Sequence, residues 1–144
     1  MDARTRLMNR LGDSNQGENV HPLVTLEEFF SANNDPSSLG LSGTRDFTPG
    51  EFFAVLTLLR SRDDVYDIRV ELDSPKSPGG WPSTDTIWIV TSLTRSELPR
   101  RALSQEFWER YLPDDWLSFP RLDGRRTEQL EIPDGMRAFG FWYH

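Results

Sequence analysis

The sequence contains no cysteine and has only two histidines, His21 and His144, which lie near the ends of the chain. Without thiols, disulfide bridges, zinc–thiolate sites and cysteine nucleophiles are excluded. A histidine triad or a site with several histidine ligands would have to be built from the chain ends. We therefore expect no metal, no cofactor and no catalytic histidine.

Long apolar stretches are also missing. No run approaches the roughly 18 apolar residues that a membrane-spanning helix needs, and the N-terminus lacks the apolar stretch of a signal peptide. These absences predict a cytoplasmic protein with no membrane partner.

Motifs that mark common enzyme classes are absent. The chain has no G-x-S-x-G, no P-loop and no G-x-G-x-x-G. A serine–lysine dyad would have to use Lys76, the single lysine, which lies in a hydrophilic loop rich in proline and glycine. The acidic groups at residues 63–67 and 114–115 lack the spacing of an EF-hand loop. Sequence alone thus predicts no catalytic residues and no metal site.

Basic charge is scarce relative to acidic charge, and the difference is localised. The net charge is −7, and residues 23–92 carry eleven acidic against five basic side chains, a net charge of −6 in that segment. Such a field repels nucleic-acid phosphates and favours a basic partner. We expect a basic protein partner and no nucleic acid.

Two helices are predicted in the first half of the chain. Thr25 and Glu28 have the spacing of a capping box, which predicts a short helix from Leu26 to about residue 32. Thr48 and Glu51 repeat that spacing, with a proline at the first helical position. Apolar residues then follow at helical intervals, which predicts a second helix over about residues 49–61.

Alternating apolar and polar residues predict two strands in the middle of the chain. A half-buried strand is expected over about residues 66–73, and a more apolar, central strand over residues 86–91. We expect the two strands to pair in antiparallel fashion.

The second half is less regular. A first helical turn is expected from Ser96, and a further helix from Ser104 to Leu112. Residues 116–127 are predicted to be irregular. Residues 129–132 and 136–143 flank Pro133-Asp134-Gly135, a turn sequence that predicts a terminal β-hairpin.

Together these segments predict the order α-α-β-β-α-β-β. That order is typical of an α+β domain with a mainly antiparallel sheet, here of about four strands backed by two to four helices. Residues 1–22 are polar with little periodicity and are expected to form a flexible N-terminal tail. Residues 23–144 would form the single domain, as a monomer or a weak homodimer.

Five residues are candidates for contact with a partner. Trp81 and Asp85 come just before the apolar strand, and aromatic anchors beside acidic groups are typical of protein interfaces. The five candidates are Asp35, Asp63, Asp64, Trp81 and Asp85. Trp81 is also compatible with the role of a core tryptophan that fixes the entry of the loop, and that interpretation is favoured.

Two stretches resemble a family of small acidic bacterial proteins of uncharacterised function, similar to immunity proteins of polymorphic and contact-dependent toxin systems. The stretches run from Val24 through Phe30 to Gly40, and from Trp81 to Ser92. The resemblance implies a non-enzymatic protein that covers the active site of a basic toxin with an acidic, rigidly held face. Charge complementarity would speed association and aromatic anchors would slow release.

Two other functions stay open on sequence alone. A small carboxylate-dependent hydrolase would need a deep pocket in which two acids converge, one of them poorly solvated. A ligand-binding or regulatory module would enclose an aromatic-lined cavity between sheet and helices.

Overall fold

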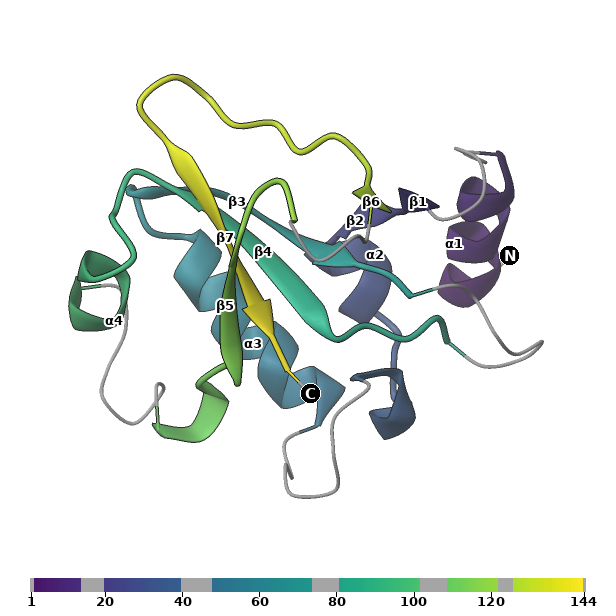
Figure 1. Cartoon of the computed structure of the whole chain (residues 1–144). Coiled ribbons are helices and arrows are strands. Elements are labelled where there is room, and N and C mark those ends of the chain that lie inside the picture. Colours follow the sequence, from purple (N-terminus) through teal and green to yellow (C-terminus); the bar gives the residue numbers. More distant parts are fainter. Residues whose placement is uncertain are drawn as a thin grey trace.

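The fold was obtained as a computed structural model, which describes residues 2–13, 20–39, 48–73, 81–101, 109–121 and 126–143 (Figure 1). The helices are α1 (Ala3–Asp13), α2 (Leu26–Phe30), α3 (Pro49–Arg60), α4 (Glu97–Arg101) and the 3₁₀ helix η1 (Pro36–Leu39). The strands are β1 (Val20–His21), β2 (Leu23–Thr25), β3 (Val65–Glu71), β4 (Thr86–Thr91), β5 (Asp115–Ser118), β6 (Arg126–Thr127) and β7 (Arg137–Trp142).

The predicted α+β class is confirmed. A five-stranded antiparallel sheet has the order β2-β3-β4-β7-β5, and β1 and β6 form a separate two-stranded parallel pair. The expected pairing of β3 with β4 is present, with Ile68 opposite Ile89. The sheet has one strand more than the number expected.

Capping explains where three helices begin. Thr25 and Glu28 exchange hydrogen bonds in the predicted capping box of α2. The Thr48 hydroxyl accepts from the Glu51 amide at the start of α3, as the spacing predicts. A third box forms between Thr94 and Glu97 and starts the turn before α4, two residues ahead of the expected Ser96.

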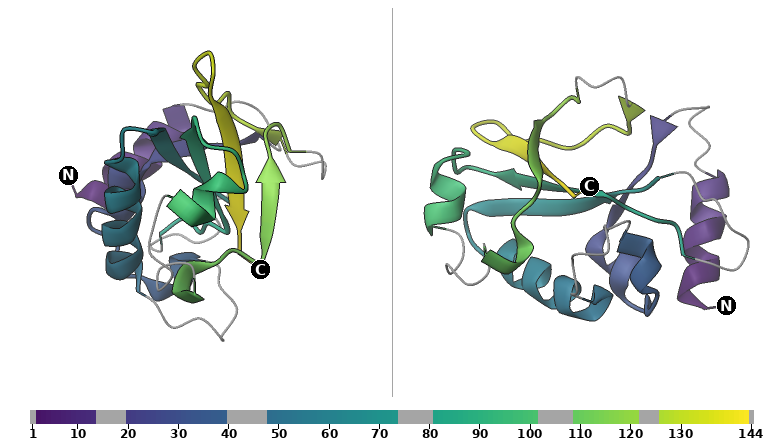
Figure 2. Two further views of the ribbon diagram at one scale, coloured as in Figure 1. Left: turned by 90° about the vertical axis from the view of Figure 1, so that its left-hand side faces the viewer. Right: turned by 60° about the horizontal axis from the view of Figure 1, so that its bottom comes forward.

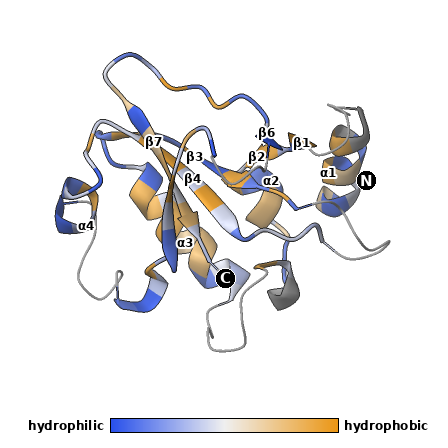
Figure 3. Ribbon diagram, viewed as in Figure 1, coloured by the Kyte–Doolittle hydropathy of each residue, from blue (hydrophilic) through white to orange (hydrophobic). Residues whose placement is uncertain are grey.

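Helices α2 and α3 cover one face of the sheet, which we call the helical face (Figure 2). Its core contains Ile68, Val70, Ile87 and Ile89, and they pack against Leu56 of α3 in one continuous cluster. Figure 3 shows hydrophobic residues concentrated on these strands and helices. All six residues of β4 are buried, so the opposite face must be covered as well.

An irregular stretch provides that second cover. Residues 126–136, the covering segment, cross the opposite face of the sheet, which we call the covered face (Figures 1 and 2). Leu130 joins Trp88, Val90 and Ala138 in a second, smaller core there. Gly140 leaves room for the Trp88 ring to lie against β7, because a Cβ at that position would lie 3.0 Å from that ring.

Two expectations for secondary structure in the second half of the chain are wrong. Residues 116–118, expected to be irregular, belong to strand β5, which pairs with β7 and sets Trp116 against Phe141. Residues 129–132 form no strand, because β4 and β5 already occupy both edges of β7. The predicted turn itself is present, with Gly135 at φ +81° and the Met136 amide donating to Pro133.

The expectation of a tail without a stable helix is also wrong. Residues 3–13 form α1, and Leu7 is buried in the core of the helical face because α1 packs on α2. Residues 14–19 lie outside the described residues, as do residues 102–108, where the helix from Ser104 was expected to begin. Residues 109–111 are helical, as predicted for the end of that helix.

Candidate functional site

Three of the five candidate contact residues lie at the two ends of β4, with Asp63 and Asp64 at one end and Asp85 at the other. The Asp64 carbonyl accepts from the Thr91 hydroxyl at 2.5 Å, which places Asp64 beside the end of the strand, with Asp63 next to it in the chain. Asp85 directly precedes Thr86, the first residue of the strand. Six residues of β-strand span about 20 Å. Asp63 and Asp64 are therefore separated from Asp85 by about the length of β4.

Trp81 and Asp85 are committed to contacts inside the protein. Trp81 is half-buried and packs against the main core, with its ring centroid 6.4 Å from that of Phe29. The Asp85 carboxylate accepts from the Thr86 hydroxyl at 2.8 Å and from the Trp142 indole at 3.3 Å. Both residues therefore help to fix the chain where it enters β4. For Trp81 this is the core role predicted from the sequence as the alternative to contact with a partner.

The three remaining candidates have different environments. The Asp64 carboxylate pairs with Arg62 at 3.0 Å, and this hydrogen bond lowers the pKa of Asp64 below its ordinary value. Asp63 is exposed. Asp35 is half-buried, and its carbonyl accepts from the Ser38 amide at the start of η1.

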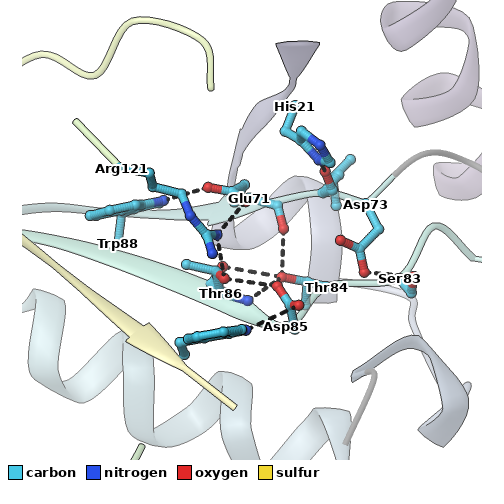
Figure 4. A network of polar contacts seen from close by, with 11 residues as sticks. His21, Glu71, Asp73, Ser83, Thr84, Asp85, Thr86, Trp88 and Arg121 are labelled. Carbon is cyan, nitrogen blue, oxygen red and sulfur yellow. Dashed lines mark hydrogen bonds and ion pairs between the residues drawn. The ribbon is translucent and has the colours of Figure 1, made fainter. Parts of the chain in front are cut away.

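A buried polar network lies at the covered face (Figure 4). The side chains of Glu71 and Arg121 are 0% and 1% exposed and form an ion pair at 2.9 Å. The Trp88 indole donates to the other oxygen of Glu71, and Arg121 also donates to the Thr86 hydroxyl. Arg121 further stacks over the Trp142 ring, at 5.5 Å from its centroid.

This network holds two segments of the chain together and does not present a reactive group to the solvent. The Glu71 carboxylate is neutralised by Arg121 and is inaccessible to a substrate. Because Arg121 comes three residues after β5, the pair and the bond to Thr86 fix the chain that leaves β5 to β3 and β4. Sequence reasoning missed it, since Glu71 has the alternation of a solvent-facing strand residue and its partner is 50 residues away.

A groove runs between β3 and the covering segment. Its volume is about 410 Å³, and it is lined by Leu23, Asp67, Arg69, Glu128, Gln129, Leu130 and Glu131. Two leucines supply its apolar lining, and three carboxylates and one guanidinium supply its charge. The groove is absent from the sequence predictions because it forms only when the covering segment meets β3.

The carboxylates of the groove are not equivalent. Asp67 is satisfied by the Ile68 amide at 2.8 Å and by Arg69 at 2.7 Å. Glu128 accepts only from the Leu23 amide and Glu131 only from the Tyr66 hydroxyl, among the residues that the structure describes. The groove therefore carries two carboxylates without a basic partner in the described part of the chain.

Tyr66 lies at the edge of this groove and is one of the few large exposed apolar residues, at 44% exposure. It stands where the register of β3 and β4 shifts, and such irregularities redirect side chains. Its hydroxyl donates at 2.6 Å to the carboxylate of Glu131, which lines the groove. That hydrogen bond raises the pKa of Tyr66, because the phenol must keep its proton to donate to the carboxylate.

A second hollow, of about 370 Å³, lies between α1 and α2. Arg6 faces it together with Glu27 and Glu28, and Glu27 is also paired with Arg60. Its charges are balanced more closely than those of the groove, so it selects less strongly for a ligand of one charge.

Two general features of the described residues bear on the sequence predictions. No group of three or more acidic or histidine side chains in them is arranged to hold a metal ion. In the same part of the chain, no helix has both the length and the apolar character needed to cross a membrane.

The chain was compared with known proteins. No solved structure matches it. The protein called "Uncharacterized protein YfbO" from Escherichia coli (strain K12) is 28% identical over 142 residues, which cover 96% of this chain and 94% of that protein. The profile of the uncharacterised YfbO family matches residues 2–141. The chain therefore belongs to the YfbO family, which confirms the expectation of an uncharacterised family.

Proposed function

We propose that this protein is a non-enzymatic protein-binding domain that receives a basic segment of another protein in the groove beside β3. The observation that carries the proposal is that Glu128 and Glu131 line this groove without a basic partner among the described residues. The proposal keeps the acidic, aromatic-containing face expected from the sequence and assigns it to other residues.

Charge pairing elsewhere in the protein supports this choice. Within the described residues, ion pairs join six other acids to arginines, namely Glu27–Arg60, Asp64–Arg62, Asp67–Arg69, Glu97–Arg101, Glu51–Arg110 and Glu71–Arg121. The two groove glutamates thus contribute uncompensated charge to a chain of net charge −7. Such a field attracts basic partners over a distance and speeds their association.

The shape of the groove suits a side chain with an apolar stem and a cationic end. Leu23 and Leu130 can cover the methylenes of an arginine or lysine, while Glu128 and Glu131 meet its charge. The volume of 410 Å³ lies within the range of about 300–1,000 Å³ that is typical of binding pockets. Groove and charge therefore favour the same class of partner.

The more specific part of the proposal is an immunity role, in which the basic partner is a toxin. It is supported by the acidity of residues 23–92 and by the resemblance carried by residues 24–40 and 81–92. Asp63 adds an exposed acid in the turn before β3, three residues from Tyr66. An immunity protein acts by binding and needs no catalytic group.

Binding at the groove can be tested by titrating the ¹⁵N-labelled full chain with a blocked eight-residue peptide in which arginine alternates with serine. We expect shifts of the Leu23, Tyr66 and Glu131 amides, and no comparable shifts with a peptide in which citrulline replaces arginine. The double variant Glu128→Gln/Glu131→Gln should bind about tenfold more weakly, because two charged contacts are lost.

A matched double variant separates this effect from net charge. Glu27→Gln/Glu51→Gln removes two exposed acids elsewhere and should change the affinity by less than about threefold. Equal weakening in both double variants, or shifts spread over the surface, would contradict the proposal. Tighter binding of spermine than of the peptide would favour the ligand-binding module instead.

The immunity role needs its own experiment. The product of the neighbouring gene is expressed with and without this protein, and growth is measured. Rescue by the parent chain that is lost in Glu128→Gln/Glu131→Gln would support the role. A neighbouring product that is harmless on its own would contradict the immunity role while leaving the protein-binding proposal intact.

A further inference from the structure

The geometry points to a specific subsite within the groove: we infer that Tyr66 and Glu131 together form a receptor for one arginine side chain of the partner. The inference rests on the proposed function and names the residue type that is bound. In the unbound protein the Tyr66 hydroxyl donates a hydrogen bond to the Glu131 carboxylate, so the arginine binds by replacing that hydroxyl as the donor.

The contact between Tyr66 and Glu131 is suited to exchange. The hydrogen bond of 2.6 Å joins two exposed residues on different segments, β3 and the covering segment. Glu131 has no other polar partner among the described residues. A guanidinium offers two parallel donors and a full charge, and such bidentate pairs are roughly twice as strong as a bond to a neutral donor.

The ring of Tyr66 supplies the second half of the subsite. Once its hydroxyl is released from Glu131, the ring still lies beside that carboxylate on the rigid strand β3, where 44% of the residue is exposed. A guanidinium paired with Glu131 is then within reach of the ring face. Arginine stacks on aromatic rings and pairs with carboxylates at the same time, which the compact ammonium of lysine does less well.

Neighbouring groups discriminate against other ligands. Arg69 remains paired with Asp67 at the same wall of the groove, so Asp67 is not a competing acceptor. Glu128 is held by the Leu23 amide and keeps its charge near the entering side chain. An acidic or phosphorylated segment would meet two uncompensated carboxylates and be repelled.

The test compares Tyr66→Phe with Tyr66→Ala in titrations with the arginine–serine peptide. Tyr66→Phe keeps the ring and removes the competing hydroxyl, so binding should tighten about threefold. Tyr66→Ala removes the stacking surface and should weaken binding about threefold. Replacing arginine by lysine in the peptide should weaken binding to the parent chain about threefold.

A spectroscopic measurement gives a readout independent of affinity. Glu131 raises the pKa of Tyr66 in the free protein, so a bound guanidinium that takes over Glu131 should lower the pKa of the Tyr66 phenol. The difference in tyrosinate absorbance between the parent chain and Tyr66→Phe isolates this residue. Glu131→Gln should lower the pKa of Tyr66 without peptide and remove most of the further change on binding.

The outcomes separate the two proposals. Equal weakening by Tyr66→Phe and Tyr66→Ala, or no change in the phenol pKa on binding, would overturn the arginine subsite while groove binding stands. Absence of any peptide binding at the groove would overturn both proposals.

Discussion

The two faces of the sheet are closed by different means. The helical face is covered by α2 and α3, and its core is built from aliphatic and aromatic side chains, with Ile68, Ile87 and Phe141 among its members. The covered face carries a smaller apolar core that includes Leu130 of the covering segment, and beside it lies the buried ion pair of Glu71 and Arg121. Apolar packing needs only residues of the right size, whereas a polar anchor needs each partner present, so the two faces should respond differently to substitution.

The largest effect is expected on the helical face, from Phe52→Ala. The Phe52 ring stacks on Tyr111 at 5.7 Å and meets Phe30 and Tyr143 edge-on. Its removal should lower the free energy of unfolding by about 4 kcal/mol, through lost burial and the cavity left behind. Urea unfolding measures this. Because the packing is apolar, Phe52→Leu should cost less than half as much, and equal costs would contradict that account.

On the covered face, Arg121→Met should lower the free energy of unfolding by about 3 kcal/mol, because Glu71 is left buried without its counter-charge. The double variant Arg121→Met/Glu71→Gln should recover most of that loss. A glutamine removes the buried charge and still accepts from the Trp88 indole.

This recovery distinguishes a polar anchor from ordinary packing. If the double variant is as unstable as the sum of its single variants, the two residues are not coupled and the contrast between the faces fails. Amide exchange should locate the loss: protection should fall first in residues 126–136 and last in α3.

A smaller effect is expected from Gly140→Ala, which tests how closely the covered face is packed. The new Cβ would lie 3.0 Å from two atoms of the Trp88 ring and 3.1 Å from Leu117. The free energy of unfolding should fall by about 2 kcal/mol because the ring is fixed by its bond to Glu71. Gly50→Ala on α3 is the control, since its Cβ would meet only Thr48 at 3.9 Å. A similar loss in both variants would show that the ring position does not matter.

The same contrast explains which parts of the fold could be predicted from the sequence. Helices α2 and α3 and strand β4 have local signals, namely capping boxes, a proline at the first turn and an apolar run. Strand β5 is only four residues long and begins and ends with a polar residue, so it has no clear alternating pattern. It forms because one edge of β7 is not paired with β4 and can accept another strand. A local pattern cannot show which strand edges are unpaired. The turn residues therefore predict that residues 129–132 pair with β7, whereas β7 pairs with β4 and β5.

The candidate site was harder to predict for a related reason. Acidity and exposed aromatic residues were expected, but Trp81 and Asp85 turn out to be used within the protein. The groove needs β3 and the covering segment, whose facing residues Tyr66 and Glu131 are 65 positions apart. Their types gave no signal, since exposed tyrosine and glutamate are ordinary in any sequence.

The smallest effect separates an exposed ion pair from the buried one. Glu27 on α2 pairs with Arg60 on α3, and this hydrogen bond lowers the pKa of Glu27 below its ordinary value of 4.5. A carboxyl whose pKa is lower in the folded state stabilises the protein at pH values above its unfolded-state pKa. That stabilisation is lost as the pH falls through the folded-state pKa. Since the pair is solvent-exposed, it should contribute only about 0.5 kcal/mol.

Glu27→Gln should therefore be slightly less stable than the parent chain at neutral pH, and the difference should vanish in acid. High salt should shrink it as well. A difference that persists unchanged at low pH would mean that Glu27 acts through packing, and exposed and buried pairs would then not differ in kind.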